Sequence, residues 1–468
     1  MGIPETTPSG SQESWGSRFG FIMATAGFAV GLGNIWHFPY VTGSNGGAAF
    51  LLVYVAFSAL IGIPLLTAEI GLGRKLGLSP LAGMRKATGS ASHPWNAIGW
   101  MGTATATIIM GYYLMLLGWI AGYLVMAISG DLAAAPQGDH AALYESFIAR
   151  SGMVLAYTGA VTAVMCAIVW RGVRHGVERL AKVGMPLFFV ILLALAIRSL
   201  TVPGAAEGLA WYLRPDFSAL DGEALLIALG QAFYSIGIGM AAAFGFGSYL
   251  DTANSDVPGN AAIVVAFDTM VAFIAGLVLF PALFAFGLEP DAGPGLLFVT
   301  MANLFGRMPA GQLLSIAFFF LLLLAGVTTA VAQIEVLVAT LEDSWSIGRT
   351  KGVILIGSGL LLLNVPVVLS QGPWSDFTVF GMDLFVLTDY VSGSLLLPIG
   401  ALALALYIAI SWGWHGFRDD LNQGAGTVKV AAGWKPFVMV LIPLAVATIL
   451  LVGLGVVLGA VRGETYGA

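Results

Sequence analysis

Charged side chains are scarce in this chain. Asp, Glu, Lys and Arg make up only 9% of its 468 residues, against about 25% in a soluble globular domain. So few charges cannot cover the surface of a water-soluble protein of this size. Hydrophobic residues make up 58%, in blocks of about 18 or more that are long enough to cross a bilayer about 30 Å thick. The composition therefore excludes a soluble enzyme, a nucleic-acid-binding protein and a disordered chain.

Cysteine and catalytic motifs are equally scarce. Cys166 is the only cysteine, which excludes an internal disulfide and a thiolate metal cluster. The sequence has neither the H-E-x-x-H motif of zinc proteases nor the G-x-x-x-x-G-K-[ST] loop that binds phosphates. We therefore expect no enzymatic activity and no coupling to ATP within this chain.

The hydrophobic blocks predict an all-α protein that crosses the membrane about eleven times. Their approximate limits are 18–41, 47–73, 96–128, 152–170, 178–200, 225–250, 259–287, 311–342, 350–370, 381–411 and 434–460. A cytoplasmic N-terminus places 14 of the 19 Lys and Arg side chains inside and 5 outside, in line with the positive-inside rule. The polar stretch before Trp15 lacks the features of a cleaved signal peptide. We expect a multi-pass protein of the plasma membrane, or of the inner membrane in a bacterium.

Two of these spans carry glycines at mid-membrane depth. Gly27, Gly31 and Gly33 lie in the first, beside Asn34; Gly237 and Gly239 lie in the sixth, near Ser235. Each glycine costs a helix interior roughly 1 kcal/mol relative to alanine, so the clusters predict broken helices. Close packing by small residues is the simpler explanation of either cluster alone. Their matching positions, five spans apart, favour an inverted-repeat transporter with its binding site at the midplane.

Five ionisable residues remain within the spans or near their ends: His37, Glu69, Asp268, Glu335 and Asp389. Charge in the bilayer interior is costly and usually functional. Asp268 lies in the middle of its span and needs a cation or a proton, of which we favour a cation. We expect Glu69 to accept hydrogen bonds from unwound backbone, and Glu335 to face the inner vestibule.

Span eight adds two adjacent hydroxyl groups, those of Thr328 and Thr329, directly after Ala325-Gly326-Val327. With a carbonyl from the preceding turn, they offer oxygen ligands to a hard cation. The alternative is that each hydroxyl bonds the carbonyl one turn back in its own helix, which is the simpler explanation when these residues are taken alone.

Several long motifs resemble those of a known family. The run Trp15-GSRFGFIMATAGFAVGLGNIWHFPYVTGSNGGAAFLLVY resembles the first two spans of neurotransmitter:sodium symporters, especially the bacterial amino-acid transporters similar to the leucine transporter. The likeness continues through Gly62-IPLLTAE, Arg171-GVRHGVERLAKVGMP, Gly230-QAFYS and Ala325-GVTT, and covers nearly the whole chain. It implies a sodium-coupled symporter that works by alternating access, built as an inverted five-plus-five helix repeat.

The resemblance also implies a domain plan and two sodium sites. A single transporter domain would cover residues 1–468, with the first repeat at about 15–200, the second at about 220–411 and an extra helix at about 434–460. One sodium would meet the carbonyl of Ala29, the side chains of Asn34, Ser235 and Asp268, and the substrate's carboxylate. The other would meet the carbonyls of Gly27, Val30 and Ala325 and the hydroxyls of Thr328 and Thr329. Because Asp268 supplies a fixed negative charge, we expect no chloride requirement.

The substrate pocket implied by the resemblance is lined by Phe28, Ala29, Gly31, Ile109, Tyr113, Tyr234, Ser235, Gly237, Met240, Thr329 and Gln333. The Tyr113 hydroxyl would hold the substrate's carboxylate, and the Tyr234 ring would close the outer lid. Monoamine transporters of the family have an acid at the position of Gly31, so a glycine there indicates a substrate with its own carboxylate. Gly237 and Gly239 leave room for a bulky side chain, and Gln333 adds a polar wall. We expect a neutral, hydrophobic or aromatic L-amino acid.

The gate residues depart most from the family. His37 stands where an Arg is usual and is expected to face Asp389 across the outer vestibule, with Gln231 nearby. Arginine keeps its charge at physiological pH and histidine does not, so we expect a pH-sensitive outer gate. The alternative is a purely structural role for His37.

The inner gate keeps Ser248, Tyr249 and Asp343, with Glu69 close to that side, but Gln12 replaces the usual arginine. Two other functions stay open on this fold: a passive channel or facilitator, and an amino-acid sensor that binds without transport. A homodimer also stays open.

Overall fold

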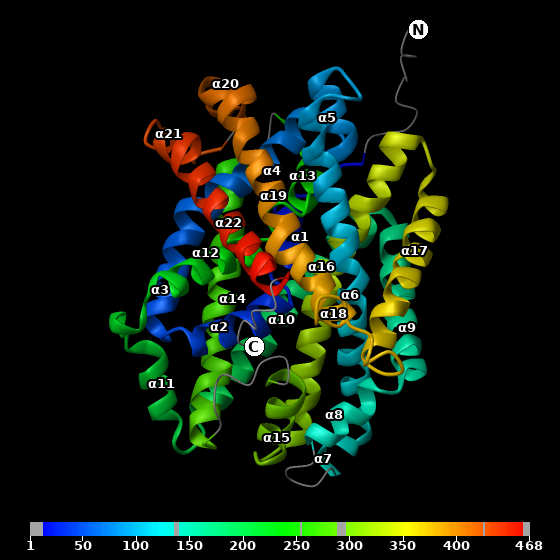
Figure 1. The fold of residues 1–468 in the computed structure, drawn as a ribbon, viewed down its shortest axis with the longest axis vertical. Helices are drawn as coiled ribbons and strands as arrows, with labels where there is room; N and C mark the ends of the chain where they lie inside the picture. Colours follow the sequence, from blue (N-terminus) through cyan, green and yellow to red (C-terminus); the bar gives the residue numbers. More distant parts are fainter. Residues whose placement is uncertain (1–12, 135–139, 253–254, 288–295, 425, 462–468) are drawn as a thin grey trace.

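Helices make up nearly all of the described chain (Figure 1). The computed structural model describes residues 13–134, 140–252, 255–287, 296–424 and 426–461. Within these ranges the pairing of extended backbone is limited to an isolated bridge between Val379 and Met382. The predicted all-α fold is therefore confirmed.

The helices of the first half of the chain are α1 (Arg18–Ala29), α2 (Phe38–Ser44), α3 (Ala48–Phe57), α4 (Ile63–Leu76), α5 (Pro80–Thr88), α6 (Ala97–Ser129), α7 (Asp131–Ala134), α8 (His140–Ile148), α9 (Ser151–Trp170), α10 (Glu178–Leu200) and α11 (Ala205–Leu213). Those of the second half are α12 (Gly222–Ile236), α13 (Ala242–Ser248), α14 (Val257–Ala285), α15 (Met301–Gly306), α16 (Gly311–Trp345), α17 (Arg349–Ser370), α18 (Leu384–Tyr390), α19 (Leu397–Tyr407), α20 (Gly413–Leu421), α21 (Trp434–Pro436) and α22 (Ile442–Val461). Short π-helical or 3₁₀-helical segments join several of them into longer continuous helices.

Nine continuous helices of the described chain are long and apolar enough to cross a membrane. A tenth is added if the bent pair α1 and α2 counts as one span. The remaining predicted span, the sixth (225–250), corresponds to α12 and α13. The break between them leaves α12 only 15 residues long, too short to cross a bilayer alone. The count of eleven spans and the cytoplasmic N-terminus stay predictions.

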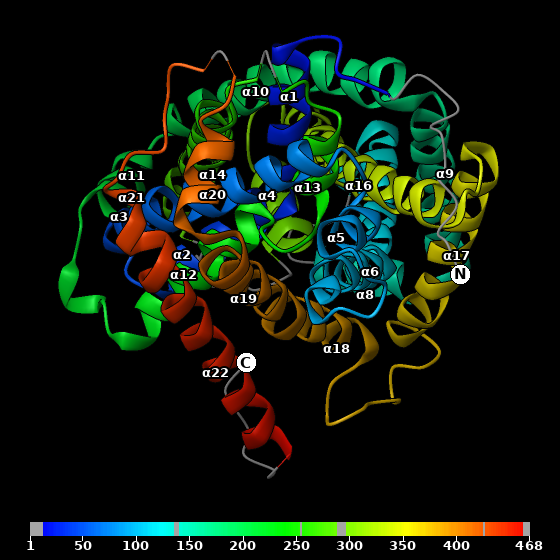
Figure 2. The ribbon, with the colours of Figure 1, turned by 90° about the horizontal axis from the view of Figure 1, so that it is seen from above.

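The broken helices lie inside the bundle. α1 contacts α10, α14 and α16, and α13 packs on α4; every residue from Gly20 to Ala29 is buried. Irregular backbone is tolerated at membrane depth only where protein or a cavity surrounds it. By contrast, α22 extends away from the body of the bundle in the view from above (Figure 2).

Apolar side chains form a stripe on the outside of α10. Val183, Val190 and Ile197 are 65%, 65% and 63% exposed, and their spacing of seven residues places them on one helix face. A soluble protein would bury such a stripe, and here the acyl chains of a bilayer cover it. The outer surface therefore suits a lipid environment.

Both predicted helix interruptions are present. α1 ends at Ala29, the chain turns at Val30–Leu32, and a second rod runs from Gly33 to Ser44 at 52° to the first. α12 ends at Ile236, and Gly237 and Gly239 then adopt φ of 72° and 86°. Ala241 also has a positive φ, 64°, a conformation that costs a residue with a Cβ about 1–2 kcal/mol. The second break therefore holds local backbone strain.

One glycine has a different role from the one predicted. Gly27 lies inside α1, where an added Cβ would be 3.1 Å from the Met185 sulfur and 3.2 Å from Thr328 Cβ. Close helix packing therefore explains Gly27, and the first break begins three residues later, at Val30. Gly239 is not among the residues that line the substrate cavity either; a Cβ added to it would be 2.9 Å from the carbonyl oxygen of Leu397 on α19.

Candidate functional site

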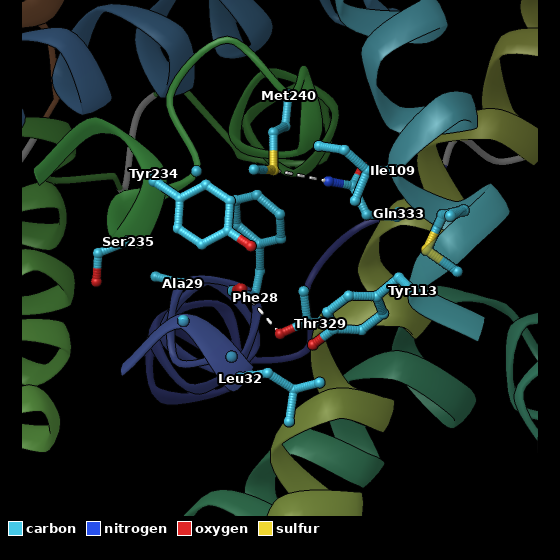
Figure 3. Close-up of a pocket in the computed structure, with 14 residues that line it drawn as sticks. Phe28, Ala29, Leu32, Ile109, Tyr113, Tyr234, Ser235, Met240, Thr329 and Gln333 are labelled. Atoms are coloured by element: carbon cyan, nitrogen blue, oxygen red, sulfur yellow. Dashed lines mark hydrogen bonds between the residues drawn. The ribbon is translucent and has the colours of Figure 1, made fainter. Parts of the chain in front are cut away.

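A cavity lies between the two breaks and encloses about 480 Å³ of empty space (Figure 3). All eleven residues predicted for the substrate pocket line it, together with Leu32, Gly33 and Met110. They come from the end of α1, the middle of α6, the break after α12, and α16. Part of this space is open solvent, and its largely apolar lining with a few polar groups is typical of a small-molecule site.

Gly31 leaves little room for a side chain. A Cβ at this position would lie 3.0 Å from the Thr329 hydroxyl and 3.4 Å from the Tyr113 hydroxyl. An acidic side chain at this position would therefore have to displace both hydroxyl groups.

A buried polar cluster lies beside the cavity, around Asp268. The Asn34 amide donates to Asp268 Oδ1 at 2.7 Å and to the Ser235 hydroxyl at 3.0 Å. Ser235 and Tyr54 donate to Asp268 Oδ2 at 2.9 and 3.0 Å. Asn34 and Asp268 are fully buried. In the part of the chain that the structure describes, no cationic side chain forms an ion pair with Asp268, so the carboxylate lacks a compensating positive charge.

Ala29 lies at the C-terminal end of α1 and lines the neighbouring cavity. Its carbonyl belongs to the broken end of the helix, where the regular helical partner is missing, and it accepts a 2.9 Å hydrogen bond from the backbone nitrogen of Gly31 instead. The cluster contains the three side chains predicted for the first sodium site. It also contains Tyr54, which the sequence analysis did not single out.

A second set of oxygens surrounds Thr329 on the other side of α1. Its hydroxyl lies 3.3 Å from the carbonyl of Gly27, 3.1 Å from that of Phe28 and 3.2 Å from that of Ala325. One hydroxyl proton can satisfy only one of these acceptors well, so the set has a surplus of lone pairs. Such a surplus suits a hard cation.

The neighbouring Thr328 hydroxyl bonds the carbonyls of Leu324 and Ala325 in its own helix at 3.1 and 2.8 Å. This is the alternative that the sequence left open, and it places the hydroxyl next to the Ala325 carbonyl. Val30 forms the turn directly after α1, and no hydrogen bond in the described chain ties its carbonyl to the threonines.

Glu69 braces the second break. Its Oε1 accepts a 2.6 Å hydrogen bond from the backbone nitrogen of Gly239, as predicted for a carboxylate near unwound backbone. The side chain is 3% exposed and comes from α4. The contact therefore ties the unwound segment to a neighbouring helix.

The outer residues are arranged differently from the expected pairing. His37 Nδ1 lies 2.5 Å from Gln231 Oε1, and its ring lies 5.4 Å from that of Tyr234. Asp389 is close enough to interact electrostatically with His37, but the described residues include no ion pair between them. The histidine side chain is shorter than that of the usual arginine. It contacts Gln231 on α12 and forms no ion pair with Asp389 in the described chain.

On the inner side, the three predicted gate residues do not form one pair. Ser248 donates to the carbonyl of Gly245, and Asp343 accepts from the backbone nitrogen of Ser79 at 2.6 Å. Tyr249 donates to Glu335 Oε1 at 3.1 Å. Each therefore bonds a different partner.

Arg349 is a cationic side chain near these predicted gate residues that the sequence analysis missed. Its guanidinium lies 2.5 Å from the fully buried Glu335 carboxylate, 3.4 Å from that of Glu342 and 3.9 Å from that of Glu13. Gln12, which replaces the usual arginine, lies outside the described residues. A signal existed, because the in-span acid Glu335 requires a cation and Arg349 follows the turn after its helix. Pairing across that turn cannot be read from spacing alone.

The segment before α1 is fixed at several points. Glu13 accepts from the backbone nitrogen of Val173 at 2.5 Å, and Gly16 donates to Glu178 at 2.7 Å. The Trp15 indole donates to the carbonyl of Phe246 at 2.9 Å. The segment thus connects the starts of α10 and α17 to α13.

A bundle of apolar helices with two broken helices around a central cavity defines a membrane transporter of the inverted-repeat type. Residues 12–143 and 137–466 match the Sodium:neurotransmitter symporter family. The chain belongs to this family.

Individual proteins support the assignment over nearly the full length. The crystal structure of MhsT in complex with L-phenylalanine superposes with a TM-score of 0.86 at 39% identity, covering 95% of this chain and all of that one. An uncharacterised sodium-dependent transporter of Bacillus subtilis, YhdH, is 35% identical over 94% of this chain and 98% of its own length. A creatine transporter of Torpedo marmorata is 27% identical over 94% and 77%.

Proposed function

We propose that the protein is a sodium-coupled secondary active symporter of neutral, hydrophobic or aromatic L-amino acids. The observation that carries this proposal is the cavity between the two breaks, flanked by one oxygen cluster around Asp268 and another around Thr329. The names of the B. subtilis relative and the ligand of MhsT agree with sodium and with an amino acid.

Coupling follows from the shared position of cation and substrate. A sodium ion beside Asp268 supplies the positive charge that this carboxylate lacks, and its remaining coordination position is open toward the cavity. The substrate's carboxylate fills that position, so each ligand raises the affinity for the other by the same factor. The second ion would join the Gly27, Val30 and Ala325 carbonyls to the hydroxyls of Thr328 and Thr329, and so hold α1 on α16.

Asp268 also makes chloride unnecessary. A fixed carboxylate balances sodium charge in a site where water is excluded and electrostatic interactions are strong. Alternating access then requires two closures. The outer one involves His37, Gln231, Tyr234 and Asp389, and the inner one is centred on Arg349.

Uptake in proteoliposomes tests this function. Purified protein should accumulate labelled leucine, phenylalanine or tryptophan against a gradient when sodium is high outside, and not when potassium replaces it. Sodium-independent equilibration would indicate a facilitator. Sodium-dependent binding without flux would indicate a sensor. Unchanged accumulation in potassium would contradict the proposal.

A further inference from the structure

The amide of Gln333 has one satisfied end and one unsatisfied end. Gln333 lines the cavity and is 1% exposed. Its nitrogen lies 3.3 Å from the Met240 sulfur, and a dashed line marks this contact in Figure 3. Its oxygen Oε1 is buried and has no hydrogen-bond partner among the described residues.

The chemistry of Met240 fixes which end is free. A thioether sulfur accepts hydrogen bonds and cannot donate them. The NH₂ group must therefore face the sulfur, and a flipped amide would place two acceptors against each other. The carbonyl oxygen Oε1 is therefore the unpaired atom. It is a hydrogen-bond acceptor in the wall of the cavity that lacks a donor.

The position of Gln333 in α16 places this acceptor near the side chain of an amino acid bound in the cavity. Gln333 lies four residues after Thr329 on α16, on the same helix face and about 6 Å further along the axis. Thr329 lies beside Gly31, since a Cβ on Gly31 would be 3.0 Å from the Thr329 hydroxyl, and this is the level at which the proposed function places the substrate's carboxylate. An amino acid held there extends its side chain toward Gln333 and Met240.

The surrounding walls are apolar and partly aromatic. Phe28, Ile109, Met240 and Tyr234 line the cavity around the amide. They suit a flat apolar ring, whereas the free oxygen suits an N–H or O–H group on its edge. A buried carbonyl left without a donor costs about 1–3 kcal/mol. The side chains of phenylalanine and leucine have no donor for this oxygen, so the cost remains. The N–H of an indole or the O–H of a phenol can donate to it and removes the cost.

We propose that Gln333 selects aromatic L-amino acids whose ring carries a hydrogen-bond donor, namely tryptophan and tyrosine, over phenylalanine and leucine. This inference rests on the proposed function, because it assumes that an amino acid occupies the cavity. It assigns Gln333 the role of accepting a hydrogen bond from the substrate's ring.

Matched ligand pairs test the assignment. Dissociation constants at saturating sodium are measured for tyrosine against phenylalanine, and for tryptophan against 1-methyl-tryptophan, which keeps the ring and loses the N–H. In the wild type the member with the donor should bind about tenfold or more tighter in both pairs. Equal affinities within both pairs would overturn the inference.

Variants separate the hydrogen bond from shape. Gln333→Met keeps the length of the side chain and removes the acceptor, so both ratios should fall to about one. Ile109→Val alters the wall without touching the acceptor and should change both members of a pair by the same factor. Ratios that persist in Gln333→Met would assign the preference to shape and overturn the role of Gln333.

Two failures are distinguishable. Sodium-dependent binding of leucine or phenylalanine without preference for the donor-bearing ligands leaves the symporter proposal intact and refutes the inference alone. Absence of sodium-dependent binding of all these amino acids refutes both. If Gln333→Met does not fold, the two wild-type ligand pairs still decide.

Discussion

Replacing Arg349 by alanine should open the inner side of the protein. Glu335 is fully buried and has the Arg349 guanidinium 2.5 Å away. Removing one partner of a buried ion pair costs about 3–5 kcal/mol. Arg349 keeps 19% exposure, so we take the lower end, about 3 kcal/mol, which corresponds to roughly a 100-fold change in an equilibrium. When the inner side opens, water can reach the Glu335 carboxylate. The loss of Arg349 therefore destabilises the closed form and not the open one.

Thiol accessibility measures the shift. Ser248 is 8% exposed and would carry the probe as Ser248→Cys in a Cys166→Ala background, in purified protein. Arg349→Ala should raise the maleimide labelling rate by one to two orders of magnitude. Adding Glu335→Gln should bring the rate back toward that of the parent, since a neutral amide no longer needs the cation.

An exposed ion pair provides the control. Arg418 and Asp419 are 38% and 59% exposed, and such pairs contribute about 0–1 kcal/mol. Arg418→Ala should therefore leave labelling unchanged. Our account of the inner gate is refuted by parental labelling in Arg349→Ala, or by a double variant as fast as the single one.

Four further predictions test the sodium sites, the outer gate and helix packing. Asp268→Asn should abolish uptake by removing the counter-charge, whereas gluconate in place of chloride should leave wild-type uptake unchanged; a strict chloride requirement would contradict this role. Thr328→Val and Asn34→Leu should each weaken the sodium dependence of substrate Kd, and a Kd equal in sodium and potassium for the wild type would exclude both sites. His37→Arg should flatten the dependence of substrate dissociation on external pH, and profiles that coincide with the wild type would leave His37 a structural role. Gly27→Ala should destabilise the protein by about 1–3 kcal/mol through overpacking against Met185 and Thr328, read as a lower midpoint of thermal unfolding.

The breaks were predictable because their causes are local. Glycine and a neighbouring polar residue mark a place where a helix is weak, and Gly237 and Gly239 indeed adopt left-handed backbone. Gly27 shows the limit of this signal. The same residue type serves close packing there, and only the neighbouring helices distinguish the two roles.

The cavity lining was predictable for a different reason. Phe28, Ala29, Gly31, Tyr234, Ser235 and Thr329 fall within motifs that resemble the family's, and the structure places all eleven residues around one space. Side-chain pairing was much harder to predict. His37 bonds Gln231, and Glu335 bonds Arg349, because reach and burial decide between several acceptors of similar chemistry. Neither the reach nor the burial of a side chain can be deduced from the amino-acid sequence alone.

The fixed segment before α1 has a practical consequence for anyone who labels or immobilises this protein. Glu13, Trp15 and Gly16 form hydrogen bonds with Val173, Phe246 and Glu178, and Glu13 lies 3.9 Å from Arg349, on which the proposed inner gate is centred. A fluorescent fusion or surface tether attached to this segment would transmit any pulling force to these hydrogen bonds and, through Glu13, to Arg349. Tension applied at that end should therefore alter the transport rate, and reporters meant to be silent are better joined elsewhere.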